Sequence, residues 1–204
     1  MNLIREIPPT AGWPINITSL TLPFFKKYPE RGLEEKFKKY LGAPAALATY
    51  SGTAAFYIIL KNLRKLSDKK TIIIPALVCP LIPLAIKRAG LQVKLCDINP
   101  NNFDFNLNAL RKVCTEDKNI LAILVVHLGG IPSELEPISE IAKKENIFII
   151  EDCAQSLGAE YHNQKTGSFG EFAFFSLCRG KGLTIYEGGL AITNKAEYAK
   201  LLDT

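Results

Sequence analysis

The fold is decided by the stretch IFIIEDCAQS, residues 147–156, in which an apolar run ends in two carboxylates. A short run of Ile and Phe that is apolar on both faces is typical of a strand buried in a parallel sheet. Asp152 would then stand at the carboxyl end of that strand, where open α/β sheets place their ligands. The stretch therefore predicts an α/β fold with a ligand crevice beside Asp152.

A lysine follows the next apolar run. Lys181 lies in FFSLCRGKGLT (174–184), 29 positions after Asp152, and the sequence EGG follows at 187–189. A lysine on a glycine-rich turn can reach the same crevice. Pyridoxal 5′-phosphate (PLP) chemistry uses such a pair, with the amine forming a Schiff base and the acid facing the pyridinium nitrogen. The pair predicts PLP as the cofactor.

A third element, YSGTAA at 50–55, separates a short apolar run from a helical pattern. Small residues there let a phosphate approach the free backbone N–H groups at a helix start, where the helix dipole also favours an anion. Gly52 and Thr53 are therefore predicted to bind the phosphate. By itself the Ser-Gly-Thr sequence also fits an ordinary N-cap.

Apolar runs alternate with helical patterns along the chain, which predicts a mostly parallel seven-stranded sheet between helices. The expected strands are Ala45–Thr49, Thr71–Ile74, Gln92–Cys96, Ile120–Val126, Asn146–Ile150, Phe172–Ser176 and Leu190–Thr193. The expected helices cover 33–41, 54–66, 80–89, 106–114 and 134–145, and another helix begins at Asn194.

The motifs, in this order, resemble the DegT/StrS family of PLP-dependent sugar aminotransferases, from about Ile7 to Thr204. They are SGTAA (51–55), HLGG (127–130), EDCAQSLGA (151–159), FSxxxxK (175–181) and EGG (187–189). The resemblance implies fold type I, a homodimer with active sites at the interface, a nucleotide-linked keto sugar as substrate and an amino acid such as glutamate as donor. This chemistry serves the biosynthesis of amino sugars, cell-surface polysaccharides or antibiotic sugars.

The resemblance also implies a domain plan. Residues 1–44 form an N-terminal arm and a helix, and residues 45–194 form the PLP-binding large domain. Residues 195–204 begin a helix leading to a smaller C-terminal domain, which is missing from this sequence. We therefore expect the chain to be the N-terminal portion of a longer enzyme.

The resemblance assigns roles residue by residue. Lys181 would form the Schiff base and then shuttle a proton, and Asp152 would keep the pyridine nitrogen protonated. Gln155 would contact the ring hydroxyl or pack against the ring, and Ser176 would join the phosphate site. Arg179 either adds a charge-assisted contact to the phosphate or points to solvent.

Two positions stay open. His127 follows a buried strand and either lines the crevice or is a structural histidine. Many relatives stack an aromatic residue on the pyridine ring after the equivalent of Pro75, and here the nearest equivalents are Val78 and Cys79. His162 lies in a stretch that predicts a hairpin turn and receives no role.

Composition narrows the function classes. Hydrophobic residues make up 48% of the chain and charged residues 22%, as in globular domains. Five cysteines without a Cys-x-x-Cys pair and only two histidines predict no metal site and no disulfide framework, and favour a reducing cytoplasm. No apolar run could span a bilayer, so we expect no membrane association. The net charge of +5 is mild, and no nucleic-acid-binding module is evident.

Parts of the pattern also fit other functions. A PLP-dependent sugar dehydratase uses the same scaffold, but in those relatives a histidine replaces the lysine. A truncated, non-catalytic remnant of such an enzyme is a rival from another class. A nicotinamide-binding domain lacks its Gly-x-Gly-x-x-Gly motif here, and a P-loop lysine would need a following Ser or Thr.

Overall fold

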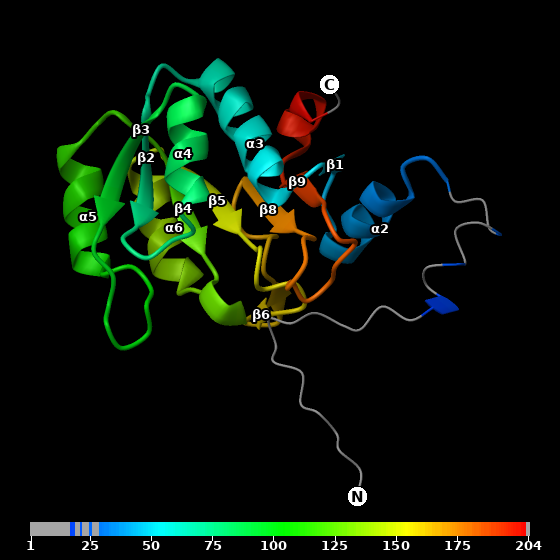
Figure 1. Cartoon of the computed structure of the whole chain (residues 1–204). Coiled ribbons are helices and arrows are strands. Elements are labelled where there is room, and N and C mark those ends of the chain that lie inside the picture. The colour runs from blue at the N-terminus through cyan, green and yellow to red at the C-terminus, as the bar shows by residue number, and fades with distance from the viewer. Residues whose placement is uncertain (1–16, 19–20, 22–24, 26–28, 203–204) are drawn as a thin grey trace, which may run out of the picture.

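The computed structural model describes residues 17–18, 21, 25 and 29–202 (Figure 1). The predicted N-terminal arm lies largely outside the described residues. Seven strands form the main sheet in the order β1-β9-β8-β5-β4-β2-β3. They are β1 Ala45–Thr49, β2 Thr71–Pro75, β3 Gln92–Cys96, β4 Ile120–Val126, β5 Phe148–Asp152, β8 Phe172–Ser176 and β9 Gly189–Thr193. Strand β9 is antiparallel to β1 and β8, and the other neighbours are parallel, so the predicted mostly parallel sheet is confirmed.

Helices cover both faces of this sheet (Figure 1). They are α2 Gly32–Leu41, α3 Gly52–Leu66, α4 Leu81–Arg88, α5 Leu107–Glu116 and α6 Leu135–Lys144, with the 3₁₀ helices η2 Leu128–Gly130 and η3 Ala196–Leu201. On β2, Ile72 and Ile74 join the core beneath α3 and α4, whereas Ile73 joins the core beneath α5 and α6. Burial of both faces explains why these strands read as continuous apolar runs.

Strand β5 lies two residues further along the chain than predicted. Asn146 has a φ of 51°, so it closes the turn after α6 and does not begin the strand. At the other end, Glu151 and Asp152 stay in the ladder with β8, opposite Ala173 and Phe174. Both carboxylates therefore belong to the strand itself.

The helix predicted from Asn194 is a 3₁₀ helix that begins at Ala196. Asn194 does not cap it, because its side-chain amide donates to the carbonyl oxygens of Gly167 and Gly170 at 3.0 and 2.8 Å. The predicted hairpin is present as β6 Glu160–Tyr161 and β7 Gln164–Lys165. In the described part of the chain, no helix combines the length and hydropathy needed to cross a bilayer.

The strand order creates a crevice. From β2 the chain moves outward through α4 to β3, and it then returns to place β4 on the opposite side of β2. Connections that leave in opposite directions from neighbouring strands open a gap at the carboxyl ends of those strands. The candidate site lies at this edge of the sheet.

Candidate active site

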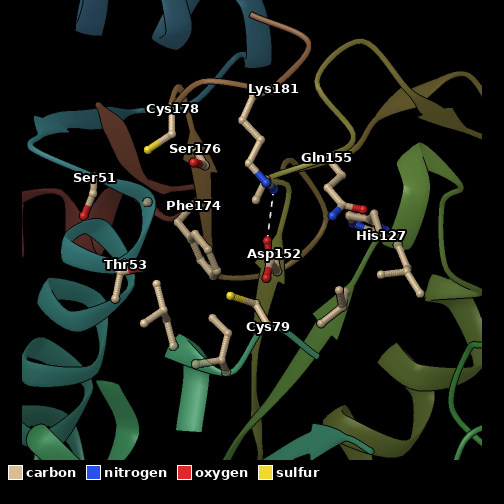
Figure 2. A pocket seen from close by; sticks show the side chains of 16 residues that line it. Ser51, Thr53, Cys79, His127, Asp152, Gln155, Phe174, Ser176, Cys178 and Lys181 are labelled. Carbon is tan, nitrogen blue, oxygen red and sulfur yellow. Dashed lines mark hydrogen bonds between the residues drawn. The ribbon is translucent and has the colours of Figure 1, made fainter. Parts of the chain in front are cut away.

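A cavity of about 420 Å³ opens at the carboxyl ends of β4, β5 and β8 (Figure 2). All six residues predicted to form the site line it, namely Gly52, Thr53, Asp152, Gln155, Ser176 and Lys181. They come from segments that are far apart in sequence and converge only through the sheet order. The geometry is thus compatible with one shared site, and the individual roles remain predictions.

One end of the cavity is formed by the start of α3. The Ser51 hydroxyl accepts a hydrogen bond from the Ala54 N–H at 3.1 Å, so the predicted N-cap is present. Among the described residues, the N–H groups of Gly52 and Thr53 have no hydrogen-bond partner, as expected for the first turn of a helix. These donors and the positive end of the α3 dipole make this end of the cavity an anion site.

Two glycines allow this helix start to lie against the sheet. A Cβ added at Gly52 would lie 2.8 Å from the Cβ of Ser176 at the end of β8. A Cβ at Gly189 would overlap the backbone of Ser51 and Gly52. The second glycine of the EGG motif is therefore required by close backbone approach, which also brings the Ser176 hydroxyl beside the anion site.

Asp152 and Lys181 form the other part of the cavity. Asp152 is only 6% exposed, and its carboxylate accepts a hydrogen bond from the Ala154 N–H at 3.0 Å. Lys181 extends from the loop after β8 toward Asp152 (Figure 2). Burial raises the pKa of Asp152 to about 6, against the opposing effects of the Ala154 N–H and the Lys181 charge. A cationic N–H donor entering the cavity would stabilise the ionised form of this carboxylate.

A tight turn directs Lys181 back to the crevice. The Lys181 N–H donates to the Cys178 carbonyl at 3.2 Å, and Gly180 between them has a φ of 79°. The Arg179 N–H donates to the Tyr186 carbonyl at 3.0 Å, which closes the loop on itself. Glycine at position 180 supplies the left-handed conformation that this turn needs.

Gln155 lies on the side of the cavity next to η2 (Figure 2). Its Oε1 accepts a hydrogen bond from the Gly129 N–H at 2.6 Å. Because the oxygen is used, the side-chain NH₂ is the group that remains to donate to a ligand. Gln155 is therefore oriented as a donor.

The structure reconciles the two alternatives for His127. The residue lines the cavity, yet it is 1% exposed and both ring nitrogens are engaged. Nδ1 accepts a hydrogen bond from the Ser133 N–H at 3.1 Å, and Nε2 lies 3.0 Å from Oε2 of Glu151. His127 is thus a structural histidine that also forms a wall.

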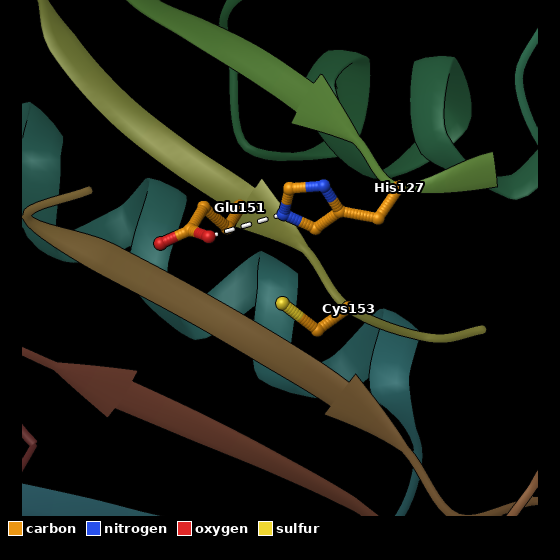
Figure 3. Close-up of side chains that lie close together, drawn as sticks. All are labelled: His127, Glu151 and Cys153. Carbon is orange, nitrogen blue, oxygen red and sulfur yellow. Dashed lines mark hydrogen bonds and ion pairs between the residues drawn. The ribbon is translucent and has the colours of Figure 1, made fainter. Parts of the chain in front are cut away.

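Glu151 was not predicted as part of the site. It is fully buried, and it forms a compact cluster with His127 and Cys153 (Figure 3). The ring nitrogens and the carboxylate oxygens in this cluster already take part in hydrogen bonds, and burial raises the pKa of the Cys153 thiol well above its usual range. Hydrogen bonds therefore account for the cluster without a metal ion.

The other positions named from the sequence differ in whether they line the cavity. Cys79 lines the cavity, whereas Val78 packs into the core beneath α3 and α4, so of these two residues only Cys79 could contact a ligand there. Arg179 does not line the cavity; it lines a neighbouring pocket with Tyr50, Ser51 and Glu187. His162 pairs with Glu136 at 2.8 Å on the surface.

Comparisons with known proteins agree with this geometry. GDP-perosamine synthase from Escherichia coli O157:H7 is 32% identical over 161 residues, covering 79% of this chain and 43% of that protein. GDP-4-keto-6-deoxy-D-mannose 3-dehydratase from Yersinia pseudotuberculosis is 28% identical, covering 83% of this chain and 44% of that protein. The structure of PseC from Helicobacter pylori, an aminotransferase in the biosynthesis of pseudoaminic acid, matches with a TM-score of 0.82 and 26% identity over 90% of this chain and 50% of that one.

This chain therefore spans about half the length of the relatives that it matches. The solved neighbours have the fold type I architecture, which the strand order and the position of the cavity share. Residues 24–204 match the model of the DegT/DnrJ/EryC1/StrS aminotransferase family. The chain belongs to the DegT/DnrJ/EryC1/StrS aminotransferase family.

Proposed function

We propose that this chain is the cofactor-binding part of a PLP-dependent aminotransferase that acts on a nucleotide-linked keto sugar, with glutamate as the expected donor. The reaction would serve amino-sugar, cell-surface polysaccharide or antibiotic-sugar biosynthesis. One observation carries the proposal: a single cavity combines an anion site at the start of α3 with a buried carboxylate and a lysine amine.

The residues present fit PLP. The N–H groups of Gly52 and Thr53, with the Ser176 hydroxyl, would hold the phosphate. The side-chain NH₂ of Gln155 would donate to the ring hydroxyl, because its oxygen is bound to Gly129. Asp152 would face the pyridine nitrogen, and Lys181 would hold the cofactor covalently. When bound, the cofactor supplies an electron sink for the α carbon of the amino donor.

Two side chains of this chain would carry the proton chemistry. The Asp152 carboxylate would hold a proton on the pyridine nitrogen through a charge-assisted hydrogen bond. Burial at 6% exposure strengthens that bond, since little water competes for the carboxylate. The Lys181 amine would move a proton between the substrate's α carbon and the cofactor's C4′ atom.

Lys181 also separates amino transfer from the dehydratase alternative. Among the matched relatives are both a GDP-perosamine synthase and a GDP-4-keto-6-deoxy-D-mannose 3-dehydratase, so overall similarity does not choose between the two reactions. A dehydratase on this scaffold would carry histidine at the position of Lys181, by the family resemblance. The lysine favours amino transfer, and a measured reaction would also exclude the non-catalytic alternative.

We further propose that the enzyme works as a homodimer. Large apolar side chains are exposed on the segment that leads into α4, on α4 itself and on the loop that carries Lys181; this rim consists of Leu77, Leu81, Leu84, Leu183, Ile185 and Tyr186. Leu81 lines the cavity itself, and Tyr186 lines the adjoining pocket. A second copy seated on the rim would cover apolar surface and shield the site from water. A cytoplasmic location remains a prediction from the sequence.

The covalent link to Lys181 gives the direct test. The protein is incubated with PLP and reduced with borohydride, and the labelled peptide is identified by mass spectrometry. We expect the pyridoxyl group on Lys181 and no visible absorption band in Lys181→Ala. Lys165→Ala is a matched control, because Lys165 lies over the Tyr40 ring and not in the cavity. A label on another lysine, or an unchanged band in Lys181→Ala, would contradict the proposal.

A further inference from the structure

The Glu151 side chain is fully buried and accepts four hydrogen bonds, of which Figure 3 shows the one from His127. Its Oε2 accepts from the Gly167 N–H at 2.7 Å and lies 3.0 Å from His127 Nε2. Its Oε1 accepts from the N–H groups of Phe169 and Gly170, both at 2.8 Å. A buried carboxylate is costly unless donors surround it, and here donors are supplied from two separate segments.

The tautomer of His127 follows from its neighbours. Because Nδ1 accepts the Ser133 N–H, the ring proton lies on Nε2 and points at Glu151. The backbone N–H of His127 donates to the Asp152 carbonyl at 3.2 Å. His127 is thus bonded both to Glu151 and to the backbone of Asp152, at the carboxyl ends of β4 and β5.

The second segment is the turn 167–170, which leads directly into β8. Asn194 holds its other side through the carbonyl oxygens of Gly167 and Gly170. A Cβ at Gly170 would lie 2.7 Å from the Ile149 carbonyl oxygen, so glycine is needed for the N–H to approach Glu151. Glu151 therefore fixes the entry of β8 relative to β5.

These two connections determine where the proposed catalytic groups lie. The register between β5 and β8 sets Asp152 opposite Phe174. Two residues later β8 ends at Ser176, and the loop that carries Lys181 begins. Consecutive residues on a strand point to opposite faces, so Glu151 acts from the face opposite the cavity.

We propose that Glu151 and His127 are positioning residues, which hold the Asp152 carboxylate and the β8 end in register for the bound cofactor. The proposal rests on the proposed function, because it assumes that Asp152 faces the pyridine nitrogen. Neither ring nitrogen of His127 is open to the substrate, so the pair acts through geometry. Misplacement of reacting groups by about 1 Å can cost about 100-fold in rate.

Glu151→Gln tests this with little change in size. One carboxylate oxygen becomes an NH₂ group, which must then face either the Phe169 and Gly170 N–H groups or the Gly167 N–H and His127. We expect the variant to retain a visible band and the Lys181 label, with the band shifted in wavelength. The rate of the glutamate half-reaction should fall about 10- to 100-fold, with the loss in kcat greater than the change in KM.

Glu171→Gln is the matched control. Glu171 also accepts a backbone hydrogen bond, from the Ile149 N–H at 2.8 Å, but it does so near the opposite end of β5. We expect it to lower the melting temperature while leaving the wavelength of the band and the half-reaction unchanged. Equal effects of the two variants on band and rate, or a wild-type band and rate in Glu151→Gln, would overturn the proposal.

A pair of His127 variants keeps the test decisive if Glu151→Gln does not fold. The amide nitrogen of Gln can replace Nε2 as the donor to Glu151, whereas Asn is too short to reach it. His127→Asn should therefore lose about tenfold more half-reaction rate than His127→Gln, and only His127→Asn should shift the band. Equal behaviour of the two variants overturns the positioning role. If wild-type protein forms no band at all, the proposed function itself is wrong.

Discussion

Asp152 is a residue whose burial lowers the stability of the cofactor-free protein. Its pKa rises from the ordinary value of 3.8 to about 6, mainly because burial disfavours the charged form. Between those two values the folded protein binds the proton more tightly than the unfolded chain does, so stability falls as the pH rises. The free energy of unfolding is highest below pH 3.8, where Asp152 is protonated in both states. This extra stability is lost as the pH rises through about 6.

Asp152→Asn should therefore have opposite effects on stability and on function. Without cofactor at about pH 8, we expect its free energy of unfolding to exceed the wild-type value by up to about 3 kcal/mol. At about pH 4 only about 0.5 kcal/mol of the difference should remain, because the wild-type residue is then protonated in the folded state and partly protonated in the unfolded chain. Urea denaturation at the two pH values measures this, and a pH-independent difference would contradict it. The glutamate half-reaction should meanwhile be strongly slowed.

Single residues differ in how visible their roles are in the sequence. The places of Asp152 and Lys181 in the cavity could be predicted, because both follow apolar runs at the ligand edge of the sheet and together match the pair that PLP chemistry uses. Glu151 could not, because its partners are largely backbone N–H groups of the turn 167–170. Any residue type except proline can supply a backbone N–H, so the sequence does not reveal these donors. The only signal in the sequence was that Glu151 is a carboxylate next to Asp152 at the end of a buried run.

The contact between the start of α3 and the end of β8 is tested by Gly52→Ala. The added Cβ would lie 2.8 Å from Ser176 Cβ, so the two elements must move apart. We expect the free energy of unfolding to fall by about 1–3 kcal/mol, and PLP to bind about tenfold more weakly as the phosphate donors shift. Thermal denaturation and a PLP titration measure the two effects.

Gly182→Ala is the control for this substitution. A Cβ at Gly182 would meet no atom within 4 Å, so the melting temperature of this variant should match that of the wild type. Wild-type PLP affinity in Gly52→Ala would indicate that the contact relaxes without moving the donors.

The sequence predicts which helices and strands exist more accurately than it predicts where each one begins and ends. The run before Glu151 predicts a strand, but the strand begins two residues later, because Asn146 lies in the turn after α6. It also ends two residues later, because Glu151 and Asp152 pair with β8. The sequence predicts that the final helix begins at Asn194. The Asn194 side chain instead donates hydrogen bonds to the turn 167–170, and the helix begins at Ala196. In both cases a contact distant in sequence overrode a local preference.

At the scale of the whole molecule, the apolar rim predicts self-association. Leu84 on α4 is 60% exposed, and Leu84→Glu should convert a dimer to a monomer by placing a charge in the proposed interface. Sedimentation velocity on the wild type and the variant measures this. Leu66→Glu, at the end of α3 and outside the rim, should remain dimeric. A dimeric Leu84→Glu would contradict the proposed role of this surface.

The α/β class and the mostly parallel sheet followed from the alternation of buried runs and helices. The order β1-β9-β8-β5-β4-β2-β3 did not, because it depends on which distant strands pair. The reversed direction of β9 was equally invisible, since its apolar run resembles those of its parallel neighbours. The convergence of six predicted residues on one cavity could be seen only in three dimensions.

The antiparallel pairing of β8 and β9 has an evolutionary consequence. Ser176 and Gly189 are ladder partners, so the segment 177–188, which carries Lys181, leaves and re-enters the sheet at the same place. The entropy of closing such a loop changes only slowly with its length. Insertions beyond Leu177, which is itself buried in the core, can therefore accumulate with little effect on the packing of the sheet. Lys181, the residue on which the choice between amino transfer and dehydration is proposed to depend, therefore lies on a loop whose length the fold can tolerate changing.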